Sequence, residues 1–375
     1  MAAAVFIAAA LFVVYTLFGY PVLLHFLARF RGRPIQRAFS PRTVSVLLPV
    51  FNGERFLAAK LDSLLALDYP AGLMNIFVLS DGSTDGTAEI AARYAGRGVH
   101  FEQLPHGGKA AALNAGLALA QAEILFLTDV RQALEASSLR ALVACFADPA
   151  VGAVSGELII RDGETQEEAN VGLYWKYEKW LRKRLSSLDS VLGATGCIYA
   201  MRRELARPLP PGCLLDDMFL PLQAFFAGYR VVFEESARAY DYPTSLDSEF
   251  RRKVRTLAGN YQLMGYLPQL LGPGNRLWLH FVSHKVARLL LPFSLLALLC
   301  SAPLLPSPWN FVCSGAQLVF YAAALADPAI SESFFLKRIS APVRTFVVLM
   351  AASFCAASIL FRPKADFWVQ TRVRS

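Results

Sequence analysis

Residues 44–54 read Val-Ser-Val-Leu-Leu-Pro-Val-Phe-Asn-Gly-Glu, an apolar run that ends in a polar turn. Short runs rich in β-branched and apolar residues, bounded by turn residues, are typical of buried strands. The stretch therefore predicts a strand over 44–49. Residues 55–67 follow the turn with helical spacing of their apolar side chains, which predicts a helix.

This strand–turn–helix unit is repeated along the next part of the chain. Strands are predicted over 76–79 and 124–127, and helices over 87–94 and 110–120. Strands that alternate with helices predict an α/β domain with a mostly parallel sheet. Ligands bind such sheets at the carboxyl ends of the strands. Three polar clusters follow the predicted strands there, Phe51-Asn-Gly-Glu54, Asp81-Gly-Ser-Thr-Asp85 and Thr128-Asp-Val-Arg131.

The composition indicates that part of this chain lies in lipid. Of its 375 residues 55% are hydrophobic and only 18% charged, whereas soluble domains have about a quarter charged residues. Residues 2–26 are long enough to cross a bilayer and lack the positive start of a signal peptide, so we predict a transmembrane helix over 1–28. Arginines at 29, 31, 33, 37 and 42 follow. Because such residues stay cytoplasmic, we expect an outer N-terminus and a cytosolic domain over 43–245.

Three further apolar segments, 289–305, 309–326 and 345–361, predict a C-terminal transmembrane region over 286–361. Four complete spans would place the basic tail, 362–375, outside the cell, against the positive-inside tendency. Either the last segment is interfacial or re-entrant, or the rule fails locally, and the sequence leaves both open.

The segments 174–184 and 250–266 combine basic and aromatic residues, a composition typical of interfacial helices. We therefore predict amphipathic helices at the membrane surface over 246–285. The net charge of +8 then suits an anionic leaflet, and we expect no nucleic-acid partner. The six cysteines form no CxxC pair and no cluster with metal-ligand spacing, which predicts reduced thiols in a reducing compartment.

Several polar residues near the predicted strand ends suit a phosphorylated ligand. Asn52, Glu54 and Asp81 can hydrogen-bond a nucleobase or a ribose, although 81–87 also has the composition of a turn and helix cap. Lys109 follows two glycines and can neutralise phosphate, without the spacing of a P-loop. Asp129 could hold a divalent cation against two phosphates.

Asp216 and Asp217 open an apolar helical stretch. Acidic residues are favoured at a helix N-terminus by the helix dipole. Alternatively, adjacent carboxylates raise the pKa of one another, which suits a general base. The residues alone leave both interpretations open.

The chain contains four ordered motifs: Pro49-Val-Phe-Asn-Gly-Glu54, Asp81-Gly-Ser-Thr-Asp85, Gly108-Lys-Ala-Ala-Ala-Leu-Asn114 and Asp216-Asp-Met-Phe-Leu220. Together they resemble glycosyltransferase family 2, which includes cellulose and hyaluronan synthases. The likeness extends from about residue 44 to 255. It implies a Rossmann-like GT-A fold flanked by transmembrane helices, an inverting single displacement, and a Mg²⁺ or Mn²⁺ ion on Asp129.

The resemblance also implies roles for particular residues. Asp217 would be the base, with Asp216 beside it. The nucleotide-sugar would contact Pro49, Phe51, Asn52, Glu54, Asp81, Ser83, Lys109, Asp129, Arg131 and Arg255. The acceptor side would include Gly193, Thr195, Gly196 and Arg252.

Two departures from the family pattern bear on these roles. Where the family often has a second D-x-D aspartate, the chain has Arg131, which either pairs with phosphate directly or points away and leaves the metal on Asp129 alone. The Q-x-x-R-W motif of processive members keeps only its arginine, at Arg255. Single transfer is therefore favoured over processive synthesis.

The function implied is transfer of a sugar, from a UDP-sugar by family expectation, to a glycan or lipid-linked acceptor at the cytoplasmic face of the plasma membrane. The alternatives are a processive polysaccharide synthase and a non-catalytic membrane partner that binds nucleotide-sugar. A transporter is disfavoured because the spans are few and lack ionisable residues. The sequence does not set the oligomeric state.

Overall fold

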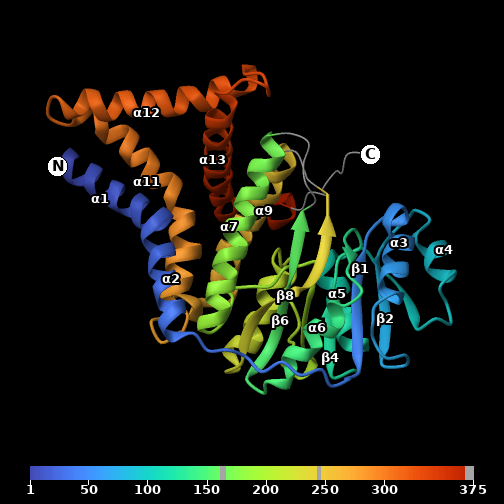
Figure 1. Cartoon of the computed structure of the whole chain (residues 1–375). Helices are drawn as coiled ribbons and strands as arrows, with labels where there is room; N and C mark the ends of the chain where they lie inside the picture. Colours follow the sequence, from blue (N-terminus) through green and yellow to red (C-terminus); the bar gives the residue numbers. More distant parts are fainter. Residues whose placement is uncertain (161–165, 243–245, 368–375) are drawn as a thin grey trace. The chain divides into compact units, whose positions relative to one another are not determined.

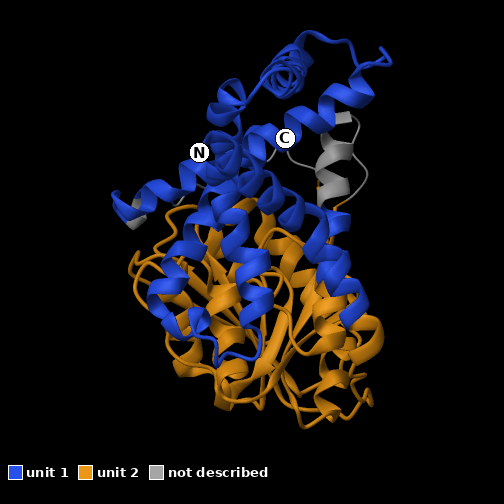
Figure 2. Cartoon of the chain, turned by 90° about the vertical axis from the view of Figure 1, so that its left-hand side faces the viewer, with its two compact units in different colours: residues 1–27, 162–181, 243–375 blue, residues 28–161, 182–242 orange. Residues whose placement is uncertain are grey.

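The computed structural model describes residues 1–160, 166–242 and 246–367. The chain forms two compact units, shown in blue and orange in Figure 2. Unit 1 comprises Met1–Leu27, Asp162–Leu181 and Pro243–Ser375, and unit 2 comprises Ala28–Arg161 and Arg182–Tyr242.

The strands of unit 2 are β1 (Val44–Val50), β2 (Met74–Asp81), β3 (Val99–Leu104), β4 (Ile124–Leu127), β5 (Ala133–Leu134), β6 (Val151–Ile160), β7 (Tyr199–Arg202) and β8 (Arg230–Asp241). They form an eight-stranded sheet in the order β3-β2-β1-β4-β7-β6-β8-β5. The pairs β1–β2, β1–β4 and β2–β3 are parallel, whereas β7 runs antiparallel to both β4 and β6. The predicted α/β fold is therefore confirmed, with a parallel half and a mixed half.

Helices connect the parallel strands of this sheet (Figure 1). The first, α3, buries Leu57, Leu61 and Leu64, which recur with helical spacing on one face. The helices of unit 2 are α3 (Glu54–Leu65), α4 (Thr87–Ala92), α5 (Lys109–Leu119), α6 (Ser138–Ala144) and α8 (Asp216–Phe226), with 3-10 turns at Cys145–Ala147 and Arg203–Leu205.

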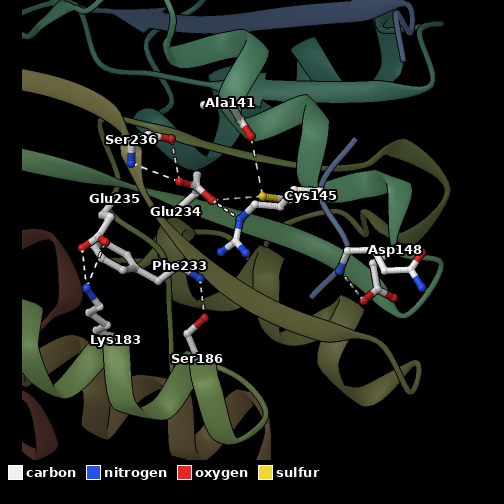
Figure 3. Close-up of polar contacts among 11 residues, drawn as sticks. Ala141, Cys145, Asp148, Lys183, Ser186, Phe233, Glu234, Glu235 and Ser236 are labelled. Carbon is white, nitrogen blue, oxygen red and sulfur yellow. Dashed lines mark hydrogen bonds and ion pairs between the residues drawn. The ribbon is translucent and has the colours of Figure 1, made fainter. Parts of the chain in front are cut away.

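A buried carboxylate ties the segment that enters unit 2 to the sheet (Figure 3). Glu234 in β8 accepts hydrogen bonds from the Ser236 hydroxyl (2.6 Å), Arg37 Nε (2.7 Å) and the Cys145 thiol (3.5 Å). Burial would raise the pKa of the Glu234 carboxyl, but Ser236 and Arg37 outweigh it and lower the pKa. Cys145 is a free thiol, as are the other five cysteines, and their reduced state in a reducing compartment stays a prediction.

Unit 1 is helical. Within the residues that the structure describes, four helical segments are long and apolar enough to cross a membrane: Ala2–Arg31, Trp278–Leu304, Trp309–Ala329 and Lys337–Leu360. They overlap the four predicted apolar segments, and the second and the fourth begin earlier than predicted, at Trp278 rather than 289 and at Lys337 rather than 345. The helices are α1 (Ala2–Val14), α2 (Tyr20–Arg31), α7 (Gln166–Leu188), α9 (Leu246–Tyr266), α10 (Trp278–Phe281), α11 (Ala287–Ser301), α12 (Trp309–Ala326) and α13 (Lys337–Ala356), of which α2 and α7 continue into unit 2.

Polar contacts join the helices of unit 1. The Tyr15 hydroxyl lies 2.6 Å from the Ser283 hydroxyl, and the Tyr20 hydroxyl lies 3.2 Å from His280 Nδ1. The buried Glu178 of α7 accepts a hydrogen bond from Arg288 of α11. These contacts hold α7 and the N-terminal helices against α10 and α11.

Candidate active site

The site is built where β1 and β2 end, because hydrogen bonds join the two loops that follow them. The backbone N–H of Asn52 donates to the Ser83 hydroxyl (3.0 Å), and the N–H of Thr84 donates to Asn52 Oδ1 (2.9 Å). Asn52 adopts φ 48°, a left-handed conformation that asparagine tolerates better than most residues. Glu54 Oε2 accepts from the Gly86 N–H (3.1 Å). The structure therefore brings the predicted residues Asn52, Glu54 and Ser83 together.

An aromatic pair lies beside these loops. Phe51 is exposed, and its ring centroid is 4.8 Å from that of His106. Exposed aromatic rings can stack on a planar nucleobase. Pro49 lies within β1, in register with Leu79 of β2.

Asp81, at the end of β2, is buried and holds the loop that precedes α5. Its Oδ1 accepts hydrogen bonds from the N–H groups of Gly107 (2.7 Å) and Gly108 (3.0 Å), and its Oδ2 lies 3.1 Å from His106 Nδ1. Asp81 therefore positions the residue that starts α5, Lys109. Direct contact between Asp81 and a nucleotide stays a prediction.

Lys109 links the end of β4 to the start of α8. Its Nζ lies 2.8 Å from Asp129 Oδ1 and 3.2 Å from Asp216 Oδ1. Burial would lower the pKa of Lys109, but Asp129 and Asp216 outweigh it and raise the pKa. One ammonium group is thus shared by two carboxylates from different elements.

Asp217 follows in the first turn of α8. Burial and the neighbouring Asp216 raise the pKa of Asp217 to about 6, although Lys109 and Arg182 oppose the shift. Burial and Asp129 raise the pKa of Asp216, and Lys109 opposes that shift. The effect of Asp216 on Asp217 is the one that adjacent carboxylates predict. A carboxylate with a pKa near 6 can accept a proton at neutral pH.

The predicted acceptor-side segment packs against Asp217. The Ala194 N–H donates to the Asp217 carbonyl (2.7 Å), and a Cβ on Gly196 would lie 3.0 Å from Asp217 Oδ2. Glycine at 196 therefore leaves room for the carboxylate. Thr195 Oγ1 accepts a hydrogen bond from Arg182 (2.6 Å). Gly193 lies in the same loop, and contact of this loop with an acceptor stays a prediction.

Lys60 was not predicted as part of the site, yet it holds the loop that carries Asp129. The lysine is 2% exposed, and its Nζ donates to Thr128 Oγ1 (2.7 Å) and to the Gln132 carbonyl (2.7 Å). Burial lowers the pKa of Lys60 to about 7. A lysine on the apolar face of a helix, between Leu57 and Leu61, is the sequence signal that could have identified it.

Arg131 pairs with the buried Asp241 at the end of β8, which also accepts from Gln132 Nε2 (2.8 Å). Of the two alternatives for Arg131, this pairing favours the one in which it does not face the phosphates. Its role as a phosphate ligand stays a prediction. Arg182 was likewise not predicted as a site residue, and the basic run 182–184 was its only signal.

A divalent ion fits this site only if the substrate provides most of its ligands. Within residues 1–160, 166–242 and 246–367, no group of three or more His, Cys, Asp or Glu side chains could hold a metal. The side chain of Asp129 is 38% exposed. Mg²⁺ commonly binds one or two carboxylates together with substrate phosphates and water, so Asp129 meets this requirement.

Arg252 and Arg255 lie in α9 of unit 1. Arg252 pairs with Glu249, and its guanidinium lies 4.8 Å from the ring centroid of Trp175. Their predicted contacts with donor and acceptor stay predictions.

Residues 45–209 match the model of the family described as Glycosyl transferase family 2. The probable glycosyltransferase YdaM of Bacillus subtilis is 24% identical over 243 residues, 60% of this chain and 57% of that protein. The N-acetylglucosaminyltransferase of Rhizobium meliloti is 24% identical over 339 residues, 84% of this chain and 79% of that protein. The chain thus spans little more than half of the Bacillus relative.

Among solved structures, the mannosyltransferase PcManGT from Pyrobaculum calidifontis, in complex with GDP-Man and Mn²⁺, has a similar fold. The TM-score is 0.74 at 23% identity, over 96% of this chain and 99% of that one. The GT-A-like sheet and the family model over residues 45–209 agree with the order of the motifs in the sequence. Residues 45–209 therefore form a glycosyltransferase family 2 domain.

Proposed function

We propose that the chain transfers a sugar from a nucleoside diphosphate sugar to an acceptor hydroxyl, with inversion at the anomeric carbon. The arrangement of Lys109 between Asp129 and Asp216, with Asp217 in the next position, carries this proposal. It provides a cation, a carboxylate able to share a metal, and a base in one site.

Asp217 acts as the general base. Its carboxylate accepts the proton of the acceptor hydroxyl as that oxygen attacks the anomeric carbon. The bond between the anomeric carbon and the diphosphate oxygen breaks, and the diphosphate leaves with the electron pair. A pKa of about 6 supports this role, because the group is ionised at pH 7 yet more basic than an ordinary aspartate.

Lys109 stabilises the departing diphosphate. A positive charge fixed where negative charge develops is among the most effective catalytic devices. A Mg²⁺ or Mn²⁺ ion held by Asp129 and the diphosphate oxygens would add further positive charge to the leaving group. Phe51 and Asn52 then bind the base and ribose at the ends of β1 and β2.

The expected donor carries uridine diphosphate, which the family resemblance favours. The GDP-Man in the solved structure of PcManGT makes a guanosine donor the first alternative to test. The expected acceptor is a glycan or a lipid-linked hydroxyl. Because the Q-x-x-R-W motif is incomplete, transfer of a single sugar is proposed over processive synthesis.

The chain is proposed to sit in the plasma membrane with unit 2 in the cytoplasm. The four apolar helices support membrane insertion by their length and composition. The arginines that follow the N-terminal helix support a cytoplasmic unit 2.

The test is release of nucleoside diphosphate by the full chain in lipid nanodiscs, with a membrane lipid extract as acceptor. UDP- and GDP-sugars are screened with Mg²⁺, with Mn²⁺ and with a chelator. We expect turnover of one donor that is lost in Asp217→Asn. It should be kept in Asp68→Asn, a control at an exposed surface ion pair. Nucleotide binding without turnover of any donor would contradict the catalytic role and favour a binding partner.

A further inference from the structure

Helices α11 and α13 of unit 1 run antiparallel. The carbonyl of Arg288, near the start of α11, accepts a hydrogen bond from Ser353, near the end of α13 (3.1 Å). Both helices also contact α12. Gln317 of α12 donates to the carbonyl of Leu298, near the end of α11 (3.3 Å), and Phe320 of α12 lies against Phe346, in the middle of α13, with ring centroids 6.1 Å apart.

The antiparallel pair restricts the path of α12. Helix α12 starts shortly after α11 ends and leads into α13, so both of its ends lie at the same end of the α11–α13 pair. Figure 1 shows α12 lying across α13 rather than alongside it. If α11 and α13 cross a bilayer, α12 starts and finishes on one side of it and cannot make a crossing of its own.

The surface of α12 suits lipid hydrocarbon. No charged residue occurs in Trp309–Ala326. Asn310, Ser314 and Gln317 lie on the less exposed side, whereas Phe311, Leu318 and Leu325 are 73%, 72% and 82% exposed. An apolar face of this kind is unfavourable in water. Trp309, at its start, belongs to the residue types enriched at membrane interfaces.

We propose that the chain crosses the membrane three times, through α1–α2, α10–α11 and α13. In this arrangement α12 lies in the plane of the membrane, within the outer leaflet. Residues that follow α13 are then on the same side as residues 28–42. The proposal rests on the membrane location proposed above.

Three crossings remove the conflict between four complete spans and the positive-inside tendency. The basic tail that starts at Arg362 returns to the cytoplasmic side, as the positive-inside tendency requires. Four of the charged residues between α12 and the first half of α13, which this arrangement places toward the outside, form ion pairs. Lys337 Nζ lies 3.2 Å from Asp327 and 3.6 Å from Glu332, and Arg344 lies 3.5 Å from Asp327. Pairing lowers the cost of moving these charges across the bilayer.

Single cysteines in an otherwise cysteine-free full chain test the crossing number. The positions are Ala3→Cys, Ser40→Cys, Ser331→Cys and Ser375→Cys, exposed to a membrane-impermeant maleimide on intact cells and again after permeabilisation. We expect labelling in intact cells at positions 3 and 331, and labelling only after permeabilisation at 40 and 375. Four crossings would exchange the results at 331 and 375.

The same experiment separates failure of the topology from failure of the membrane location. If positions 40 and 375 fall on one side, the crossing number is odd, whichever side that is. Recovery of the chain in the soluble fraction would instead contradict the membrane location itself. The unsubstituted cysteine-free chain is the control for background labelling.

Leu318→Cys tests what covers α12. We expect this thiol to react with a lipid-soluble maleimide and to resist the impermeant reagent, even after permeabilisation. Disulfide-linked dimers at position 318 would show that a second copy covers the helix, and rapid reaction with the impermeant reagent would show that it faces water. Either result would overturn lipid as the occupant.

Discussion

Carboxylates are neutralised differently in unit 1 and in the candidate site of unit 2. In unit 1, Glu178 pairs with Arg288, Glu249 with Arg252, and Asp327 with Lys337, so each of these buried acids has a basic partner. In the site, Asp129 and Asp216 share Lys109, and Asp217 lies next to them. The pairs of unit 1 are typical of structural contacts. The excess of negative charge in the site raises the pKa of an acid, as is typical of functional sites.

The largest effect on turnover is expected at Asp217, the proposed base. Asp217→Asn keeps the shape of the side chain but removes the proton acceptor, so turnover should fall by about a thousandfold. Donor affinity should stay within about twofold, because the base contacts the acceptor. Steady-state rates and donor titration measure both. An equal loss in Asp68→Asn would show that the change is unspecific.

Lys109→Met is expected to have the next largest effect. It leaves Asp129 and Asp216 without their common cation, so turnover should fall by about a hundredfold and donor affinity should drop. The variant should also unfold at a lower temperature. Adding Asp129→Asn should restore part of that stability without restoring turnover. Restored turnover in the double variant would contradict a catalytic role for Lys109.

The pH profile should follow Asp217. Below pH 6 the base becomes protonated, so kcat/KM should fall about tenfold per pH unit. The folded-state pKa is raised, so the folded chain binds a proton more tightly than the unfolded chain does. Stability from this group is present at low pH and is lost as pH rises through about 6. Asp217→Asn should therefore raise the melting temperature at pH 8 relative to wild type, and the gain should shrink toward pH 5.

Lys60→Met should have a smaller effect on turnover. The substitution keeps the length of the side chain but removes the two hydrogen bonds that hold residues 128–132, which should destabilise the fold by about 1–3 kcal/mol. Looser placement of Asp129 should raise the donor KM more than it lowers kcat. Lys183→Met, at an exposed ion pair with Glu235, is the matched control. An unchanged donor KM would show that Lys60 has only a structural role.

The smallest effect on turnover is expected in unit 1. Lys337→Met leaves the buried Asp327 with Arg344 as its remaining basic partner, which should destabilise the chain by about 1.5–3 kcal/mol. Turnover per folded molecule should stay the same. Thermal unfolding and turnover of the same nanodisc sample measure the two quantities. A large loss of turnover per folded molecule would contradict the contrast between the units.

The sequence predicted unit 2 well because parallel strands end at one edge of the sheet. Asn52, Asp81 and Asp129 each follow a predicted strand, and the fold then brings their loops together. The sequence did not reveal that Asp81 holds the loop of Gly107 and Gly108, or that Arg131 pairs with Asp241. Such contacts join residues that are far apart in the chain, so a local sequence pattern cannot predict them.

In unit 1 the helices could be predicted from the sequence, but their placement could not. Hydropathy predicted its apolar helices, with α12 at the observed bounds, because a long apolar run is itself the signal. Hydropathy could not predict the orientation of these helices relative to a membrane, because length and composition do not distinguish a helix that crosses the membrane from one that lies in its plane. The contacts of Gln317 and Ser353, between separate helices, support our proposal that α12 lies in the plane of the membrane.

The central claim is an inverting single displacement at Asp217. The most direct measurement is the anomeric configuration of the product, determined by NMR with the donor identified in the screen. We expect a glycosidic bond with the configuration opposite to that of the donor. A product that retains the configuration of the donor would require a different mechanism and would contradict a single displacement at Asp217.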